Sequence, residues 1–189
     1  MIIFCVIVAW PWLGIGGPDH AGAVASFERG ETAFRAGDPK QAVGHYRRAV
    51  ELDPEYADAD LRLGALYDQR GQYDAAIGHL SRAIDLDPGQ VEAYRLRGRA
   101  YRQKGDVISA LADHHEAIRR SLDDSRSYLD RAEDYEAIGE NERALADCNE
   151  AIRLEPSRRA YMTRAPVYRS LGDDEKAELD EEAAREYAE

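Results

Sequence analysis

The small and apolar residues of this chain return with a fixed period of 34 residues. The period is carried by an alanine series and a glycine series, at Ala42, Ala76, Ala110 and Ala144 and at Gly37, Gly71, Gly105 and Gly139. A period of this length is typical of repeat architectures, in which each unit is too small to bury its own apolar face. We therefore predict a stack of similar units in place of one globular core.

Each unit has the pattern of two amphipathic helices separated by a glycine. In the clearest unit, residues 57–90, Gly64 and Tyr67 fall on one face of a first helix that should end near Gly71. A second helix carries apolar residues at spacings of 3, 4 and 7, namely Ala76, Ile77, Leu80, Ala83 and Ile84. Gly71 supplies the backbone freedom needed just past a helix end, and Pro88 stops the second helix. Each unit is therefore expected to form a helical hairpin.

The same pattern predicts five units in all, over residues 23–56, 57–90, 91–124, 125–158 and 158–189. The last unit is one residue short and has Pro166 inside its first helix, which we expect to be kinked or to start late. Its second helix carries Glu178 and Glu181 where the second unit has Ile77 and Leu80. A polar outer face lets a solenoid end without exposing its core, so we interpret this unit as a cap.

These series resemble the tetratricopeptide repeat, in which small and aromatic residues lie on two antiparallel helices with a closing proline. The aromatic and proline positions that carry the resemblance are Tyr67, Tyr101, Tyr135 and Tyr168, and Pro54, Pro88 and Pro156. The resemblance implies an all-α, right-handed solenoid of about five antiparallel helix-turn-helix hairpins over residues 26–189. It also implies a concave groove, lined by the first helices, that holds an extended peptide or a partner helix.

Residues 1–25 lie outside the repeat and have the pattern of a hydrophobic leader. No charged residue occurs from Ile2 to Gly17, and small-x-small sites follow at Ala21–Ala23 and Ala23–Ala25. This combination is typical of a secretory signal peptide, so we predict export to the periplasm or the cell exterior. No Lys or Arg precedes the apolar stretch, however. The alternatives are a membrane anchor formed by residues 2–17, which is short and interrupted by Pro11, and an assigned start that is not the true one.

Charge and cysteine content exclude several kinds of partner. The formal net charge of −12 disfavours binding to nucleic acid or to anionic lipid, because phosphate binding requires an excess of Lys and Arg. We therefore expect no nucleic-acid partner and no membrane insertion of the mature domain. Cys5 and Cys148 are too far apart, in too different surroundings, to indicate a disulfide framework or a cysteine metal site.

No pattern in the chain indicates catalysis, a cofactor or a metal. His114 and His115 are adjacent, and neighbouring residues on a helix point about 100° apart, so they are poorly placed to chelate one ion. His114 takes the half-buried place that Tyr46, Leu80 and Cys148 hold in other units. The sequence contains no glycine-rich phosphate loop, nucleophile elbow or zincin pair. We predict a protein that is not an enzyme.

The best functional signal is a basic cluster on the first helix of the third unit. Arg95, Arg99 and Arg102 are spaced i, i+4 and i+7, hence on one face, and the repeat register directs that face into the groove. Arginines of neighbouring first helices extend the cluster, and apolar contacts would come from three further positions: Arg62, Arg126 and Arg159, and Phe27, Phe34 and Leu61.

The arginine cluster has two interpretations. It binds an acidic segment of a partner, or it pairs with flanking carboxylates as an intramolecular lattice between repeats, at Asp58, Asp68, Glu133 and Glu136. Members of the family that read chaperone C-termini use a Lys/Asn carboxylate clamp, and the corresponding places here hold Phe27, Glu31, Leu61 and Ala65. That specificity is not expected.

The predicted function is a protein–protein interaction module that binds an extended or helical segment, with an acidic segment as one candidate. The alternative is a structural spacer or a self-associating assembly subunit without a dedicated peptide ligand. A third option is an accessory fragment of an enzyme complex that has no chemistry of its own.

Overall fold

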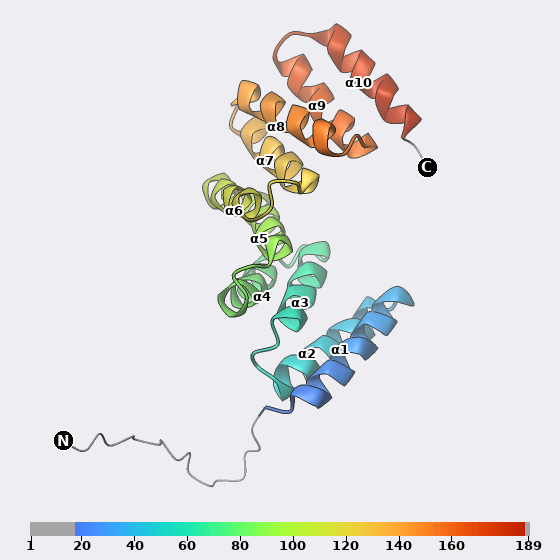
Figure 1. Cartoon of the computed structure of the whole chain (residues 1–189), viewed down its shortest axis with the longest axis vertical. Helices are drawn as coiled ribbons and strands as arrows, with labels where there is room; N and C mark the ends of the chain where they lie inside the picture. The colour runs from blue at the N-terminus through green and yellow to red at the C-terminus, as the bar shows by residue number, and fades with distance from the viewer. Residues whose placement is uncertain (1–17, 188–189) are drawn as a thin grey trace, which may run out of the picture.

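The computed structural model describes residues 18–187, which form ten α-helices arranged as five successive hairpins. The helices are α1 (His20–Arg35), α2 (Pro39–Leu52), α3 (Ala57–Gln69), α4 (Tyr73–Leu86), α5 (Val91–Gln103), α6 (Val107–Arg120), α7 (Ser125–Ala137), α8 (Asn141–Leu154), α9 (Arg158–Ser170) and α10 (Asp174–Glu186). The hairpins stack one after another along the long axis of the molecule (Figure 1). The predicted all-α solenoid of five units is confirmed.

The two helices of a hairpin approach closely where the first helix carries glycine. A Cβ atom added at Gly30 would lie 2.5 Å from the Tyr46 ring, and one added at Gly98 would lie 2.6 Å from Nε2 of His114. At Gly64 the added atom would overlap the Leu80 side chain in the same way. The residues opposite these glycines are fully buried, so the expectation that His114 is half-buried is wrong. The close helix crossing is what buries it.

The turn glycines adopt the backbone conformation that their series predicts. Gly71 has φ 70° between α3 and α4, and the corresponding Gly172 of the last hairpin has φ 80°. All five positive-φ residues among those described are glycines at this one turn position. A side chain is strained in this region of φ, which explains the recurrence of glycine there.

The core changes character along the stack. In the first three hairpins it is mainly apolar, and residues such as Leu63, Leu66 and Leu96 form one continuous cluster. The boundary between the third and fourth hairpins instead buries charged side chains, including Asp130 and Asp134. Buried charges require partners, and the arginines described below supply them.

Helix α9 begins at Arg158 and continues through Pro166 to Ser170, so the expected late start of this helix is wrong. Ser157 caps its first turn by accepting a hydrogen bond from the Ala160 amide at 3.3 Å. Ala165 and Val167, on either side of the proline, are buried, and Val167 belongs to an apolar cluster with Ala132, Ala144 and Cys148. The cap and this packing maintain the helix despite the proline.

The first helix begins upstream of the predicted domain boundary at residue 26. Asp19 caps α1 by accepting a hydrogen bond from the Gly22 amide at 2.9 Å, and Ala23 is completely buried. Residues 20–25, which the small-x-small pattern assigns to the leader, thus belong to α1. Residues 1–17, with the proposed signal or anchor segment, lie outside the described residues. Within residues 18–187, no helix has the length and hydrophobicity that crossing a membrane requires.

Candidate functional site

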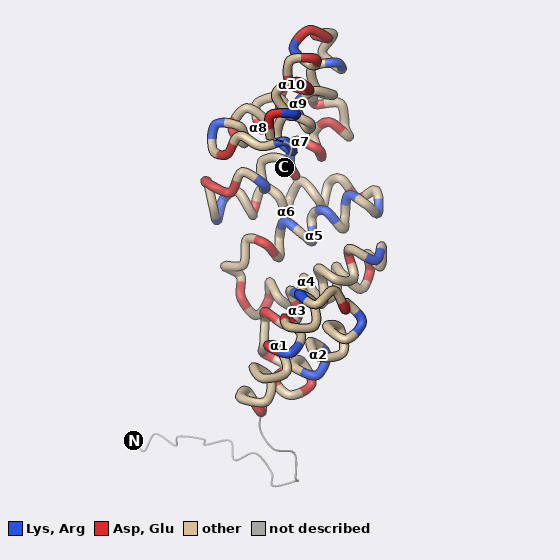
Figure 2. The backbone as a smooth tube through the Cα atoms, turned by 90° about the vertical axis from the view of Figure 1, so that its right-hand side faces the viewer, with Lys and Arg blue, Asp and Glu red and all other residues tan. Residues whose placement is uncertain are grey.

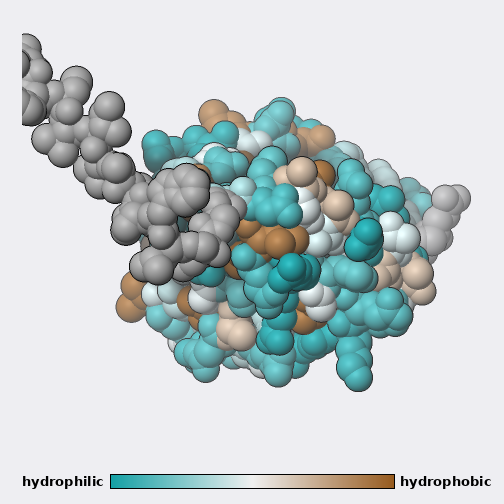
Figure 3. Space-filling model, turned by 90° about the horizontal axis from the view of Figure 1, so that it is seen from below, coloured by the Kyte–Doolittle hydropathy of each residue, from teal (hydrophilic) through white to brown (hydrophobic). Residues whose placement is uncertain are grey.

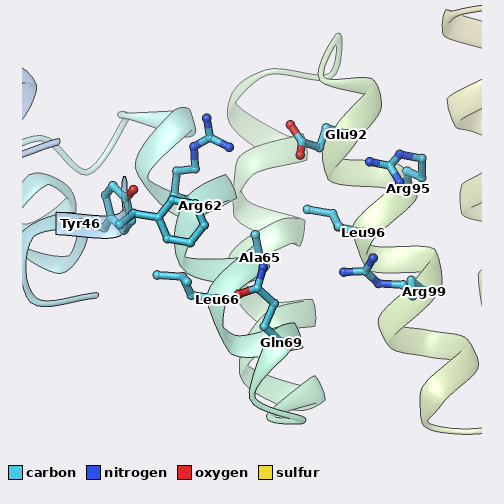
Figure 4. A pocket seen from close by; sticks show the side chains of 10 residues that line it. Tyr46, Arg62, Ala65, Leu66, Gln69, Glu92, Arg95, Leu96 and Arg99 are labelled. Atoms are coloured by element: carbon cyan, nitrogen blue, oxygen red, sulfur yellow. The ribbon is translucent and has the colours of Figure 1, made fainter. Parts of the chain in front are cut away.

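A hollow of about 270 Å³ lies where the first helices of successive hairpins meet (Figure 4). Its lining comes from α1, α2, α3 and α5, through Phe34, Tyr46, Arg62, Ala65, Leu66, Gln69, Glu92, Arg95, Leu96 and Arg99. On both α3 and α5 the lining residues follow the first of them by three, four and seven positions, so each helix presents one stripe to the hollow. We call this hollow the groove site.

The groove site has an apolar floor with one exposed aromatic ring. Leu66 and Leu96 are buried, whereas the Phe34 ring is 44% exposed. The hydroxyl of Tyr46 donates a hydrogen bond to Glu31 at 2.7 Å. Burial, together with this carboxylate, raises the pKa of Tyr46 well above its ordinary value, so the hydroxyl remains a donor. The floor therefore offers apolar contact next to a polar rim.

Three of the predicted arginines, Arg62, Arg95 and Arg99, line the groove site, and Arg62 and Arg99 are each held on one side by a carboxylate of the preceding hairpin. Nε of Arg62 lies 2.9 Å from Glu31, and Nε of Arg99 donates to Asp68 at 3.0 Å. Their side chains remain 41% and 34% exposed, respectively. Each guanidinium is thus held in position by a carboxylate of the same chain and is still exposed to solvent.

Arg95 and Arg102 are engaged differently, because they connect the third hairpin to the fourth. Nη1 of Arg95 donates to the buried Asp130 at 3.1 Å, and its side chain is 9% exposed. Nη1 of Arg102 donates to Asp134 at 2.7 Å and to the Asp130 carbonyl at 2.8 Å. The contacts of these two residues are those of an intramolecular lattice between repeats, one of the two interpretations of the cluster. Figure 2 shows several basic residues along α5 and acidic residues on the neighbouring helices.

Arg126 and Arg159 lie away from the groove site and line a separate hollow of about 420 Å³. Arg126 is exposed and lies 3.4 Å from Asp124. Arg159 pairs with Asp130 and, at 2.9 Å, with Glu133. Burial alone would lower the pKa of Arg159, but these carboxylates raise it well above its ordinary value. Arg159 therefore extends the buried network of the fourth and fifth hairpins.

Two of the three predicted apolar contacts lie in the core and do not line the groove site. Leu61 is 7% exposed and belongs to the main apolar cluster. Phe27 packs its ring against Tyr46 and Tyr56, with centroids 5.4 and 5.2 Å away. Phe34 alone of the three lines the hollow.

Some groove residues are absent from the sequence prediction, although a signal for them exists. Gln69 lies seven residues after Arg62, and Glu92 lies seven before Arg99. Both therefore fall on the helical stripes that the arginines define. Extending the arginine spacing in both directions along each helix would have identified them.

The remaining polar candidates have structural surroundings. No group of three or more potential metal ligands occurs within residues 18–187. Burial raises the pKa of the Cys148 thiol to about 12, so the reactive thiolate is disfavoured. Neither observation indicates a reactive centre in this part of the chain.

A family model described as tetratricopeptide repeat matches residues 27–91 and 66–125. The chain belongs to the tetratricopeptide repeat family. Proteins of this family generally mediate protein–protein interactions and are typically scaffolds without catalytic activity.

Solved structures share the fold at low sequence identity. The MamA protein is 24% identical, with a TM-score of 0.74 over 88% of this chain and 91% of that one. TTC0263, a thermophilic TPR protein of Thermus thermophilus, is 22% identical, with a TM-score of 0.75 over 88% of this chain and 91% of that one. YrrB, described as a TPR protein with an unusual peptide-binding site, is 17% identical, with a TM-score of 0.69 over 87% and 86%. No curated protein matches the chain.

Proposed function

We propose that the protein is an interaction module whose groove site receives a segment of another protein. The observation that carries this proposal is the exposed ring of Phe34 beside an apolar floor, with the half-exposed Arg62 and Arg99 on its rim. Exposed aromatic and arginine side chains around a concave apolar surface are characteristic of binding sites. The peptide-binding site named for YrrB supports a peptide as the ligand of a related fold.

The lining favours a segment with one apolar anchor residue next to an acidic residue. Full burial of an anchor side chain is worth about 1.5–3 kcal/mol, whereas an exposed ion pair is worth about 0.2–1 kcal/mol. The anchor on Phe34 and Leu96 would thus supply most of the affinity. The acidic residue, facing Arg62 and Arg99, would set the orientation and the association rate. Glu92 on the same rim would oppose a second acidic residue near it.

Site-specific photo-crosslinking in the native host tests this proposal. A photoreactive residue at the exposed Gln69 lies in the groove site, and one at Arg48 on α2 serves as the control outside it. We expect one foreign polypeptide to crosslink at position 69 and not at 48, and this adduct to disappear in a Phe34→Ala background. Adducts formed only with copies of the same chain would support the self-associating alternative. Equal labelling at both positions would contradict a dedicated groove ligand.

We also propose that the protein is exported. The uncharged stretch from Ile2 to Gly17 supports this proposal, whereas the small-x-small sites after it lie within α1. Trp10 and Trp12 are the only tryptophans, so the processed chain would show tyrosine emission alone. Intact-mass measurement of native material that returned the full-length chain would contradict cleavage.

A further inference from the structure

A second hollow, of about 730 Å³, lies between the first three hairpins and shares no lining residue with the groove site. It is lined by Arg47, Tyr67, Gly71, Gln72, Tyr73, Asp74, Ala75, His79 and Lys104. We propose that this hollow binds a phosphate group, either as the free ion or on a phosphorylated side chain. The proposal rests on an excess of hydrogen-bond donors over acceptors around one space.

Arg47 and Tyr67 provide two of these donors. Nε and Nη2 of Arg47 both donate to the Tyr67 hydroxyl oxygen, at 3.1 and 2.5 Å, and no described carboxylate lies within ion-pair distance of this arginine. Because the Tyr67 oxygen accepts from Arg47, its own proton must point elsewhere, and no described residue accepts it. Tyr67 is only 7% exposed. A tyrosine hydroxyl whose proton has no acceptor among the described residues therefore lines the hollow, beside a cation without a counterion.

His79 adds a ring that is fixed in position. Its Nδ1 lies 2.7 Å from the fully buried carboxylate of Asp60, and the imidazole stacks on Tyr67 with ring centroids 5.3 Å apart. Nε2 makes no hydrogen bond within residues 18–187. Because the Asp60 carboxylate accepts from Nδ1 and also lies 3.5 Å from Arg82, Nε2 is the ring nitrogen that is left to meet a ligand in the hollow.

The start of α4 supplies backbone donors. The N-cap residue Gln72 makes no side-chain hydrogen bond to the first turn, a property that α4 shares with α3, α5, α7 and α8. The first-turn amides of Tyr73, Asp74 and Ala75 thus lack a side-chain acceptor, and these residues line the hollow. The amino end of a helix carries partial positive charge, which favours an anion there.

One acidic residue opposes the anion. The Asp74 carboxylate lies on the rim, 87% exposed, and pairs with Nζ of Lys104. Both side chains are exposed to solvent, so the ion pair can open. The long side chain of Lys104 can then turn to a bound phosphate. Asp74 then remains as a like charge. Substitution of Arg47 should therefore weaken phosphate binding, and substitution of Asp74 should strengthen it. A loss of structure would not produce opposite effects.

Backbone amide chemical shifts, followed as inorganic phosphate is added at pH 7 and constant ionic strength, test the proposal. We expect saturable shifts at Tyr73, Asp74 and Ala75. Arg47→Gln should raise Kd at least fivefold, and Asp74→Asn should lower it at least twofold. Arg48→Gln, at an exposed arginine that pairs with Glu51, is the matched control and should leave Kd unchanged. Thermal melts of all variants confirm that they fold.

A second titration separates the two sources of the phosphate group. It uses a short peptide that carries phosphoserine, and the same peptide without phosphate. Tighter binding of the phosphopeptide than of the free ion indicates a phosphorylated protein segment, and equal binding indicates a free-ion site. Shifts that chloride reproduces, or that Arg47→Gln leaves unchanged, would overturn the proposal.

Discussion

Nδ1 of His114 lies 2.5 Å from the carboxylate of Asp134, and both side chains are completely buried at the boundary between the third and fourth hairpins. Nε2 of the same ring lies 3.2 Å from the Arg95 carbonyl. His114 thus places two polar atoms where the second hairpin has the apolar Leu80. One ring joins α5, α6 and α7.

Replacing His114 by leucine should destabilise the protein, although leucine is the native residue at the corresponding place in the second hairpin. The substitution leaves Asp134 and the Arg95 carbonyl with one fewer hydrogen bond each. Loss of a buried, hydrogen-bonded partner costs about 1–3 kcal/mol. Urea unfolding should show this loss, and Leu80→Val should cost less because it removes only apolar contact. A His114→Leu protein as stable as the native one would show that Arg102 alone satisfies Asp134.

Stability should depend on pH through Asp130. Burial raises the pKa of this carboxyl, but Arg159 and Arg95 outweigh it and hold the pKa below the ordinary value. A group with a lowered folded-state pKa stabilises fully above its unfolded pKa, about 3.9, and loses that contribution as pH falls through the folded value.

Asp130→Asn should therefore be less stable than the native protein at pH 7, by about 3–5 kcal/mol if the buried arginines lose their counterion. The difference between the two should shrink as pH falls below about 4. Urea unfolding at pH 7, 5 and 3 measures both curves. Parallel curves over this range would show that Asp130 does not supply the acid sensitivity.

Arg62 is the most informative groove residue to replace. Its pair with Glu31 is partly exposed, so Arg62→Gln should change the free energy of unfolding by less than about 1 kcal/mol. Binding of the segment captured at Gln69 should weaken several-fold and become less dependent on salt. Arg99→Glu should weaken binding at least tenfold, but it also places a carboxylate beside the buried Asp68 and should cost stability. Arg48→Gln is the control, and equal binding by Arg62→Gln would remove this arginine from the site.

Removal of residues 1–25 should destabilise the first hairpin more than removal of residues 1–17. The longer truncation deletes the Asp19 cap, its amide bond to the Leu52 carbonyl at 2.9 Å and the buried Ala23. Loss of a helix cap alone costs about 1 kcal/mol. Thermal unfolding of the two forms gives the comparison. Equal melting temperatures would show that the first turn of α1 contributes nothing.

Amide hydrogen exchange should be fastest in α9 and α10 among the helices. In a solenoid each unit contacts only its neighbours, and within residues 18–187 the last hairpin packs on the fourth hairpin alone. α9 also contains Pro166, and Leu179 on α10 is 57% exposed. Protection of α9 and α10 equal to that of α3 and α4 would contradict this gradient.

The repeat is predictable from sequence because its determinants are local. Gly98 and His114, 16 residues apart, fix the crossing within one hairpin, and a single period reveals every such pair. The periodic signal comes from buried positions and not from the surface. The face shown in Figure 3 is mostly hydrophilic, with separated hydrophobic patches.

The pairing of the arginines is not predictable in this way. Arg95, Arg99 and Arg102 lie on one helical stripe, yet Arg99 reaches back to Asp68 while Arg102 reaches forward to Asp134. The direction depends on how successive hairpins rotate against each other and on how deep each side chain lies. The spacing of residues along one helix gives neither the rotation between hairpins nor the depth of a side chain. The shared face of the arginines was therefore predicted, but the partner of each arginine was not.

The boundary between the third and fourth hairpins has a mechanical consequence. Apolar faces tolerate small changes of angle, because contact between methyl groups has little directional preference. The bonds from Arg95 to Asp130 and from Arg102 to Asp134 hold only at one relative orientation. The pairs across the earlier boundaries, Arg62 with Glu31 and Arg99 with Asp68, involve partly exposed arginines. Torsion applied to the solenoid should therefore be absorbed mainly where α2 packs on α3 and α4 on α5, while the third and fourth hairpins rotate as one stiff block.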